Sequence, residues 1–178
     1  HDDWFYKEAD GSIKFAENPP KKYEDIYPYN YYNEDYKNLW LEVRDTLVYW
    51  ADQGFDIFRI DNPHTKPFLF WEWVIADVKS THPHVVFLAE AFTRPKLMQR
   101  LAKLGFDQSY SYFTWRTEKA EIQEYLEELT QTELNEYMRA NFFPTTPDIH
   151  PEHLKDASPQ AFEMRLTLAA TLSSVYGM

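Results

Sequence analysis

The chain has 178 residues, and its 18 lysine and arginine residues against 29 aspartate and glutamate residues give a formal net charge of −11 at pH 7. Hydrophobic residues make up 44% of the sequence, which is enough for a buried core and excludes a disordered acidic tail. A pI near 4.9 argues against nucleic acid or an anionic membrane as a partner, because either would require clustered basic charge. No apolar run approaches the roughly 18 residues that span a bilayer. Because the chain has no cysteine, disulfides and thiolate metal sites are excluded.

Residues 1–33 form an aromatic-rich segment in which we expect loops. Its two adjacent prolines, Pro19 and Pro20, prevent a helix and favour an extended or turning backbone. The beginning of the chain lacks the basic and apolar regions of a secretory signal peptide and has no initiator methionine. We therefore expect the natural start to lie upstream.

From about residue 34, segments with helical periodicity alternate with short apolar runs that are typical of buried strands. The first helical pattern includes Leu39, Val43 and Leu47 and runs to Gly54, a residue type that often ends helices. In chain order, the sequence predicts helix 39–54, strand 55–61, helix 71–82, strand 85–90, helix 97–105, strand 109–113, helix 122–129, strand 138–143 and helix 160–173.

Strands that alternate with helices predict parallel βαβ units and therefore an α/β fold. A complete (β/α)8 TIM barrel typically has about 250 residues, whereas this chain shows only four or five βα units. We predict that residues 1–178 are a fragment of one barrel domain, comprising its middle-to-late βα units and truncated at both ends. A free-standing doubly wound sheet is the alternative, although no Gly-rich phosphate loop follows any predicted strand.

Three carboxylates, Asp61, Glu90 and Asp148, stand where an apolar or aromatic run meets a loop, at the end of a predicted strand. Active sites of parallel α/β folds lie at the carboxyl ends of the strands. Retaining glycosyl transfer requires a carboxylate nucleophile and a second carboxyl group that acts as acid and then as base. Arg59 lies two residues before Asp61 on the same strand face, from which it can keep Asp61 ionised.

Each of these carboxylates also has a simpler interpretation. Asp148, in Thr-Thr-Pro-Asp, and Asp61, before Asn-Pro, would both suit turns. Glu90 follows five apolar residues in a predicted strand, where glutamate is depleted, and a structural ion pair with Arg94 is its simplest explanation. The six histidines show no repeated metal-ligand spacing, so we expect no metal site.

Two strings, RIDNPHTKP at 59–67 and FLAEAFTRP at 87–95, resemble the α-amylase superfamily (glycoside hydrolase family 13). Three further strings look more narrowly like the family of α-1,4-glucan:maltose-1-phosphate maltosyltransferases: ENPPKKYEDIYP at 17–28, GFDQSYSYFTWR at 105–116 and NFFPTTPDI at 141–149. Together the resemblance covers almost the whole chain.

The resemblance implies Asp61 as nucleophile, Glu90 as general acid/base and Asp148 as transition-state stabiliser. Without the family, the Lys-Lys pair at 21–22 would be interpreted as a solvated loop. The resemblance implies three substrate-binding residues: Asp25, which would contact the maltosyl unit, Asn62, which would contact both sugar and phosphate, and Arg59. The phosphate contacts that it implies are Asn18, Lys21 and Tyr23.

The implied reaction is a double displacement that retains configuration. A maltosyl unit moves from α-maltose 1-phosphate to the non-reducing end of an α-1,4-glucan, phosphate is released, and neither metal nor organic cofactor is required. The resemblance also suggests a cytoplasmic homodimer. Two alternatives remain open: an α-amylase-type hydrolase or transglycosylase, and an inactive glucan-binding fragment.

Overall fold

The computed structural model describes residues 1–177, and of Asn18 it describes the backbone only. The chain divides into two compact units. The first unit comprises His1–Asp56 and Thr65–Val85, and the second comprises Ile57–His64 and the chain from Val86 onward.

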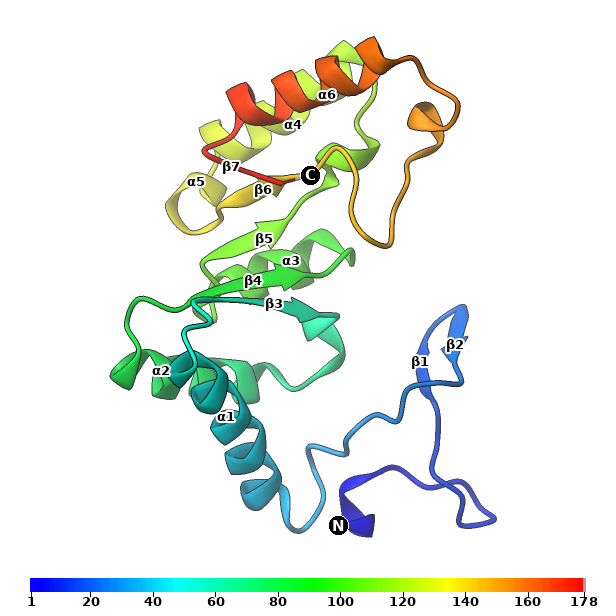
Figure 1. Cartoon of the computed structure of the whole chain (residues 1–178), viewed down its shortest axis with the longest axis vertical. Coiled ribbons are helices and arrows are strands. Elements are labelled where there is room, and N and C mark those ends of the chain that lie inside the picture. Colours follow the sequence, from blue (N-terminus) through cyan, green and yellow to red (C-terminus); the bar gives the residue numbers. More distant parts are fainter. Residues whose placement is uncertain (178) are drawn as a thin grey trace. The chain divides into compact units, whose positions relative to one another are not determined.

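The first unit contains a short hairpin and two long helices (Figure 1). Strands β1 (Ala16–Asn18) and β2 (Lys21–Tyr23) pair in antiparallel fashion around the two prolines, where an extended or turning backbone was expected, although no strand pair was predicted. Strands of three residues are too short to show the alternation by which a strand is recognised. A 3-10 helix at Asp2–Trp4 was likewise not predicted.

Helices α1 (Tyr36–Asp52) and α2 (Phe68–Thr81) confirm two predicted helices of this unit. An aromatic cluster holds this unit together, because Tyr31 and Trp40 pack on the fully buried ring of Phe70 with centroids 4.8 and 5.3 Å away. Helix α2 begins three residues earlier than predicted, directly after Pro67, whose fixed φ suits the entry to a helix.

The second unit is built on a five-stranded sheet in the order β3-β4-β5-β6-β7, in which every neighbouring pair is parallel (Figure 1). Because the strands are parallel, their carboxyl ends all lie at the same end of the sheet. The strands are β3 (Ile57–Asp61), β4 (Val86–Glu90), β5 (Gln108–Tyr110), β6 (Ala140–Phe142) and β7 (Val175–Tyr176).

The helices of the second unit are α3 (Pro95–Ala102), α4 (Lys119–Gln131), α5 (Leu134–Tyr137) and α6 (Pro159–Leu172). Helices α4 and α6 lie side by side in Figure 1 and pack over β6 through a buried cluster that includes Tyr125, Phe142 and Ala169. Phe142 is 1% exposed, and its ring stacks on that of Phe113 with a centroid distance of 4.5 Å. This aromatic stack fixes the carboxyl end of β6.

Several element boundaries differ from the prediction. The strand predicted at 109–113 stops at Tyr110, and Tyr112–Trp115 form a 3-10 helix instead. The side chain of Ser111 donates a hydrogen bond to the carbonyl of Asn141 at 2.8 Å, at the point where the chain leaves the sheet. The two-residue strand β7, the four-residue helix α5 and the 3-10 helices at Pro63–Thr65 and Glu152–Leu154 are also too short for a periodic signal.

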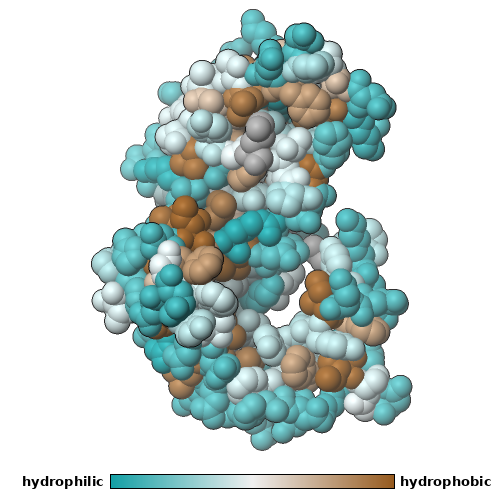
Figure 2. Space-filling model, viewed as in Figure 1, coloured by the Kyte–Doolittle hydropathy of each residue, from teal (hydrophilic) through white to brown (hydrophobic). Residues whose placement is uncertain are grey.

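The surface in Figure 2 is mostly hydrophilic, with scattered hydrophobic areas in place of a continuous apolar band. Within residues 1–177, no helix is both long and apolar enough to cross a membrane.

Candidate active site

The register of β3 and β4 places two of the predicted carboxylates next to each other. Asp61 and Glu90 are the last residues of these strands and are direct partners in the parallel ladder. The backbone N–H of Asn62 then donates to the carbonyl of Glu90 at 3.0 Å. Asn62 has a φ of 45°, in the left-handed region that asparagine tolerates better than most residues, so the chain turns sharply away from the site. The interpretation of Asp61 as a mere turn residue is therefore wrong, because Asp61 ends a strand.

Arg59 links the carboxylates of the second unit. Its Nη2 lies 3.1 Å from Oδ2 of Asp148 and 3.7 Å from Oε1 of Glu90. Its Nε donates a hydrogen bond to the hydroxyl of Tyr110 at 3.0 Å. One guanidinium thus gathers side chains that three different parts of the chain supply.

Glu90 occupies an environment that favours its protonated form. Its side chain is buried, with only 6% of the residue exposed. This burial raises the pKa of Glu90, and the hydrogen bond and negative charge of Asp61 raise it further, while the positive charge of Arg59 acts in the opposite direction. When two neighbouring carboxyl groups lie in different environments, their pKa values are pushed apart, so that one can act as an acid while the other is ionised.

The simplest explanation of Glu90 was a structural ion pair with Arg94, and the structure gives it a different arginine as partner. Among the described residues, Glu90 pairs with Arg59 and not with Arg94, which occupies the N-cap position of α3. Burial beside both Asp61 and Arg59 therefore distinguishes Glu90 from a solvated surface carboxylate.

The prediction that Asp148 stands at the end of a strand is wrong. Strand β6 ends at Phe142, and Asp148 lies further along in a tight turn that Thr146 and Ile149 close by backbone hydrogen bonds of 3.0 and 3.3 Å. The side chain of Asp148 is 71% exposed and nevertheless reaches Arg59. The prediction that Asp148 lies in a turn is therefore correct for its backbone. Its side chain, however, shares the guanidinium of Arg59 with Glu90.

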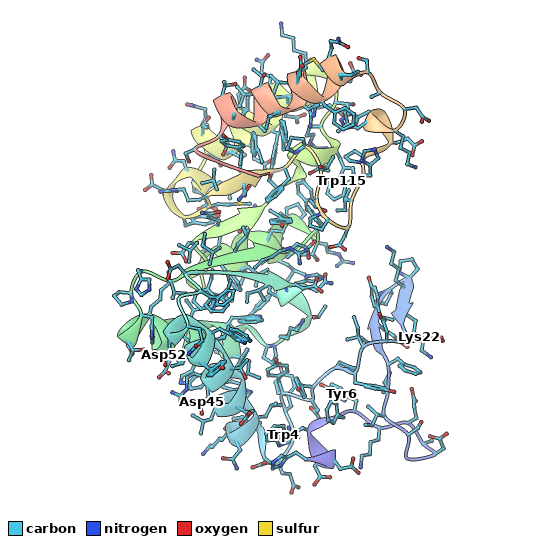
Figure 3. All side chains as sticks on the ribbon, viewed as in Figure 1. Trp4, Tyr6, Lys22, Asp45, Asp52 and Trp115 are labelled. Atoms are coloured by element: carbon cyan, nitrogen blue, oxygen red, sulfur yellow. The ribbon has the colours of Figure 1, made fainter. Side chains whose placement is uncertain are left out.

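An aromatic wall, composed of Phe92, Tyr110, Phe143 and Trp115, adjoins these carboxylates. The ring of Tyr110 lies 4.4 Å from that of Phe143 and 5.7 Å from that of Phe92, and Phe92 meets Trp115 edge to face at 4.7 Å. Trp115 belongs to the 3-10 helix after β5 (Figure 3). Sequence analysis missed Tyr110, because the strand was predicted to continue to residue 113. Its position as the last residue of β5 is the signal that would have found it.

Three of the four residues expected to contact the donor phosphate, Asn18, Lys21 and Tyr23, lie on the hairpin of the first unit, whereas Asn62 belongs to the second unit. Lys21 and Tyr23 are the ends of β2, Asp25 follows them, and Asn18 is paired with Lys21 across the ladder, although its side chain lies outside the described residues. The neighbouring Lys22 lies 5.4 Å from the ring centre of Phe15 (Figure 3). The carboxylates belong to the second unit, so the role of the hairpin toward them rests on the sequence resemblance.

In the part of the chain that the structure describes, no group of three or more His, Asp or Glu side chains is arranged to hold a metal ion.

The fold is that of the α-amylases. A crystal structure of an α-amylase from Lactobacillus plantarum superposes with a TM-score of 0.74 at 22% identity, covering 99% of this chain and 44% of the amylase. An α-amylase from Geobacillus thermoleovorans, complexed with acarbose, gives a TM-score of 0.73 at 15% identity over 98% of this chain and 42% of the amylase. These similarities confirm the predicted partial (β/α)8 barrel over the doubly wound alternative.

Sequence identity relates the chain to a narrower group of proteins than the α-amylase fold does. Along its full length the chain is 57% identical to the α-1,4-glucan:maltose-1-phosphate maltosyltransferases of Cereibacter sphaeroides and Chlorobaculum tepidum, and 54% identical to that of Myxococcus xanthus. It spans 30%, 27% and 27% of the length of these three relatives. No family model matches the chain. The matches confirm the resemblance to the maltosyltransferases that the motifs predicted.

Proposed function

We propose that the chain carries the catalytic carboxylates of a retaining maltosyltransferase that is longer than this segment. The whole protein would move a maltosyl unit from α-maltose 1-phosphate to the non-reducing end of an α-1,4-glucan and release phosphate. The observation that supports this most is the register that pairs Asp61 with Glu90. Arg59 in turn joins Glu90 to Asp148, and the chain is 57% identical to a named maltosyltransferase.

In the proposed first step, a carboxylate oxygen of Asp61 attacks the anomeric carbon of the donor. The bond from that carbon to the phosphate oxygen breaks, Glu90 gives its proton to the departing phosphate, and a maltosyl ester of Asp61 remains. The raised pKa of Glu90 suits this proton donation. Asp148 would hold sugar hydroxyls while positive charge develops on the ring.

In the second step, the ionised Glu90 takes the proton of the terminal 4-hydroxyl of the glucan. The hydroxyl oxygen then attacks the anomeric carbon from the opposite face, the ester bond breaks, and Asp61 is released as a carboxylate. Two inversions at the same carbon retain its configuration. Water must be poorly placed near the ester, because hydrolysis would otherwise compete with transfer.

Donor recognition is proposed for the hairpin of the first unit. Lys21 and Tyr23, with Asn18 and Asn62, would contact the phosphate, and Asp25 would contact the maltosyl unit. Lys21 and Lys22 supply adjacent cations in a protein whose net charge is −11, which supports a phosphate-binding role for this hairpin. Residues 1–178 would form part of one barrel domain, and the whole protein would be a cytoplasmic homodimer, both as the family resemblance suggests.

A second candidate function is α-amylase-type hydrolysis or transglycosylation of glucan. It is favoured by the fold, because solved structures that superpose on the chain are α-amylases. The same pair of carboxylates could activate water in place of a sugar hydroxyl. Dependence on a phosphorylated donor separates this function from maltosyl transfer.

The experiment measures phosphate release from α-maltose 1-phosphate by the full-length parent protein, with and without a malto-oligosaccharide acceptor. We expect acceptor-dependent release, products that grow by two glucose units, and loss of both in Asp61→Ala. Asp45→Ala, an exposed carboxylate on α1 (Figure 3), serves as the matched control and should keep wild-type activity. Shortening of the glucan without phosphate release would support the hydrolase, and no turnover of either kind would leave a glucan-binding fragment.

A further inference from the structure

Tyr110 is a buried residue at the carboxyl end of the sheet whose hydroxyl faces the candidate site. It ends β5 and is 3% exposed. The rings of Phe143 and Phe92 pack against its ring at 4.4 and 5.7 Å. A tyrosine packed in this way loses little further freedom when its hydroxyl holds a partner in place.

The partner of that hydroxyl is Arg59. The Nε of Arg59 donates to it at 3.0 Å, and the guanidinium carbon lies 5.5 Å from the centre of the Tyr110 ring. The Nη2 of the same guanidinium faces the carboxylates of Asp148 at 3.1 Å and Glu90 at 3.7 Å. Tyr110 and the carboxylates therefore bind different nitrogens of one planar group.

Ion pairs alone would hold this guanidinium weakly. The side chain of Arg59 is 32% exposed and that of Asp148 is 71% exposed, and ion pairs accessible to water contribute little and do not fix one geometry. The contact with Glu90, at 3.7 Å, is longer than a hydrogen bond. The bond to Tyr110 is the one contact of Arg59 described here that comes from a side chain packed on both sides.

We propose that Tyr110 is a positioning residue for the proposed transfer reaction, because its hydroxyl holds the guanidinium of Arg59 where it bridges Glu90 and Asp148. This inference rests on the proposed function of the three carboxylates. Tyr110 acts through Arg59. Loss of the hydroxyl would let Arg59 follow the exposed Asp148 and withdraw from Glu90.

The test compares Tyr110→Phe with wild type in the full-length protein, by measuring kcat and KM for acceptor-dependent phosphate release from pH 5.5 to 9. Phenylalanine keeps the ring and its packing and removes only the hydroxyl. We expect kcat to fall about tenfold, since a small misplacement of a charged group near the reacting atoms costs at least this much, while KM changes less than about twofold. The alkaline limb of the kcat/KM profile should move to higher pH, because the charge of Arg59 lowers the pKa of Glu90.

Tyr137→Phe is the matched control. Its hydroxyl is buried and, among the described residues, has no hydrogen-bond partner, so its removal should leave kcat and the pH profile unchanged. An unchanged kcat in Tyr110→Phe would overturn the inference. A lower kcat with an unmoved alkaline limb and a lower melting temperature would also overturn it, because that result describes a structural role only.

Failure of the proposed function gives a different result in the same assay. If wild type shortens glucan and releases no phosphate, maltosyl transfer is refuted, and the two tyrosine variants are then compared in glucan hydrolysis, which would use the same carboxylates. A lower rate and a moved limb in Tyr110→Phe would still support positioning there. A wild type that turns over neither substrate would overturn both proposals.

Discussion

Replacement of Glu90 by glutamine should make the protein more stable and far less active. Burial, together with the hydrogen bond to Asp61, raises the pKa of Glu90. A group whose pKa is raised on folding binds its proton more tightly in the folded state, so its contribution to stability is present at low pH and is lost as the pH rises. Glutamine has the shape of the protonated acid, and its amide can donate to Asp61 without a proton to lose.

The expected size follows from the surroundings of Glu90. A buried polar group that is incompletely satisfied costs about 1–3 kcal/mol. The Nη2 of Arg59, 3.7 Å from Oε1, offsets only part of this cost once Glu90 is ionised. We therefore expect Glu90→Gln to gain about 1 kcal/mol in the free energy of unfolding at pH 8. The rate of transfer should fall by about 10²–10⁴-fold, since the general acid and base are removed.

Urea unfolding of the full-length protein, followed by tryptophan fluorescence between pH 5 and 8, tests the stability effect. The advantage of Glu90→Gln over wild type should shrink steadily as the pH falls toward 5, because the raised pKa of Glu90 makes proton uptake stabilise the folded wild type over the unfolded chain. Glu136→Gln, an exposed residue on α5, should show no such trend. A variant less stable than wild type at pH 8, or a difference that does not depend on pH, would refute the reasoning.

Two further substitutions separate packing from chemistry. Phe142→Ala should lower the free energy of unfolding by about 3–5 kcal/mol, because Phe142 is 1% exposed and stacks on Phe113; denaturant titration checks this, and a loss below about 1 kcal/mol would contradict it. Asp148→Asn should change stability by less than about 1 kcal/mol, since its ion pair with Arg59 is exposed to water. Its transfer rate should nevertheless fall by at least about tenfold, and a wild-type rate would remove Asp148 from the site.

The sequence by itself determined the alternation of helices and strands beyond residue 34 and the placement of Asp61 and Glu90 at strand ends. Both signals are local. Apolar periodicity depends on residues that are near one another in the chain, and a carboxylate after an apolar run can be recognised from the sequence alone. Short elements escaped the same analysis. The hairpin around Lys21 and the two-residue strand β7 contain too few residues to establish a period.

Only the tertiary structure decided which carboxylates meet and what holds them. The parallel register pairs Asp61 with Glu90, and no periodicity states which residues of two strands will be partners. Arg59 was predicted to serve Asp61, and the structure adds contacts of its guanidinium with Asp148 and Glu90 and with the hydroxyl of Tyr110. These contacts join residues that are remote in the chain, and they form only because parallel strands align their carboxyl ends and a turn returns Asp148 to that edge.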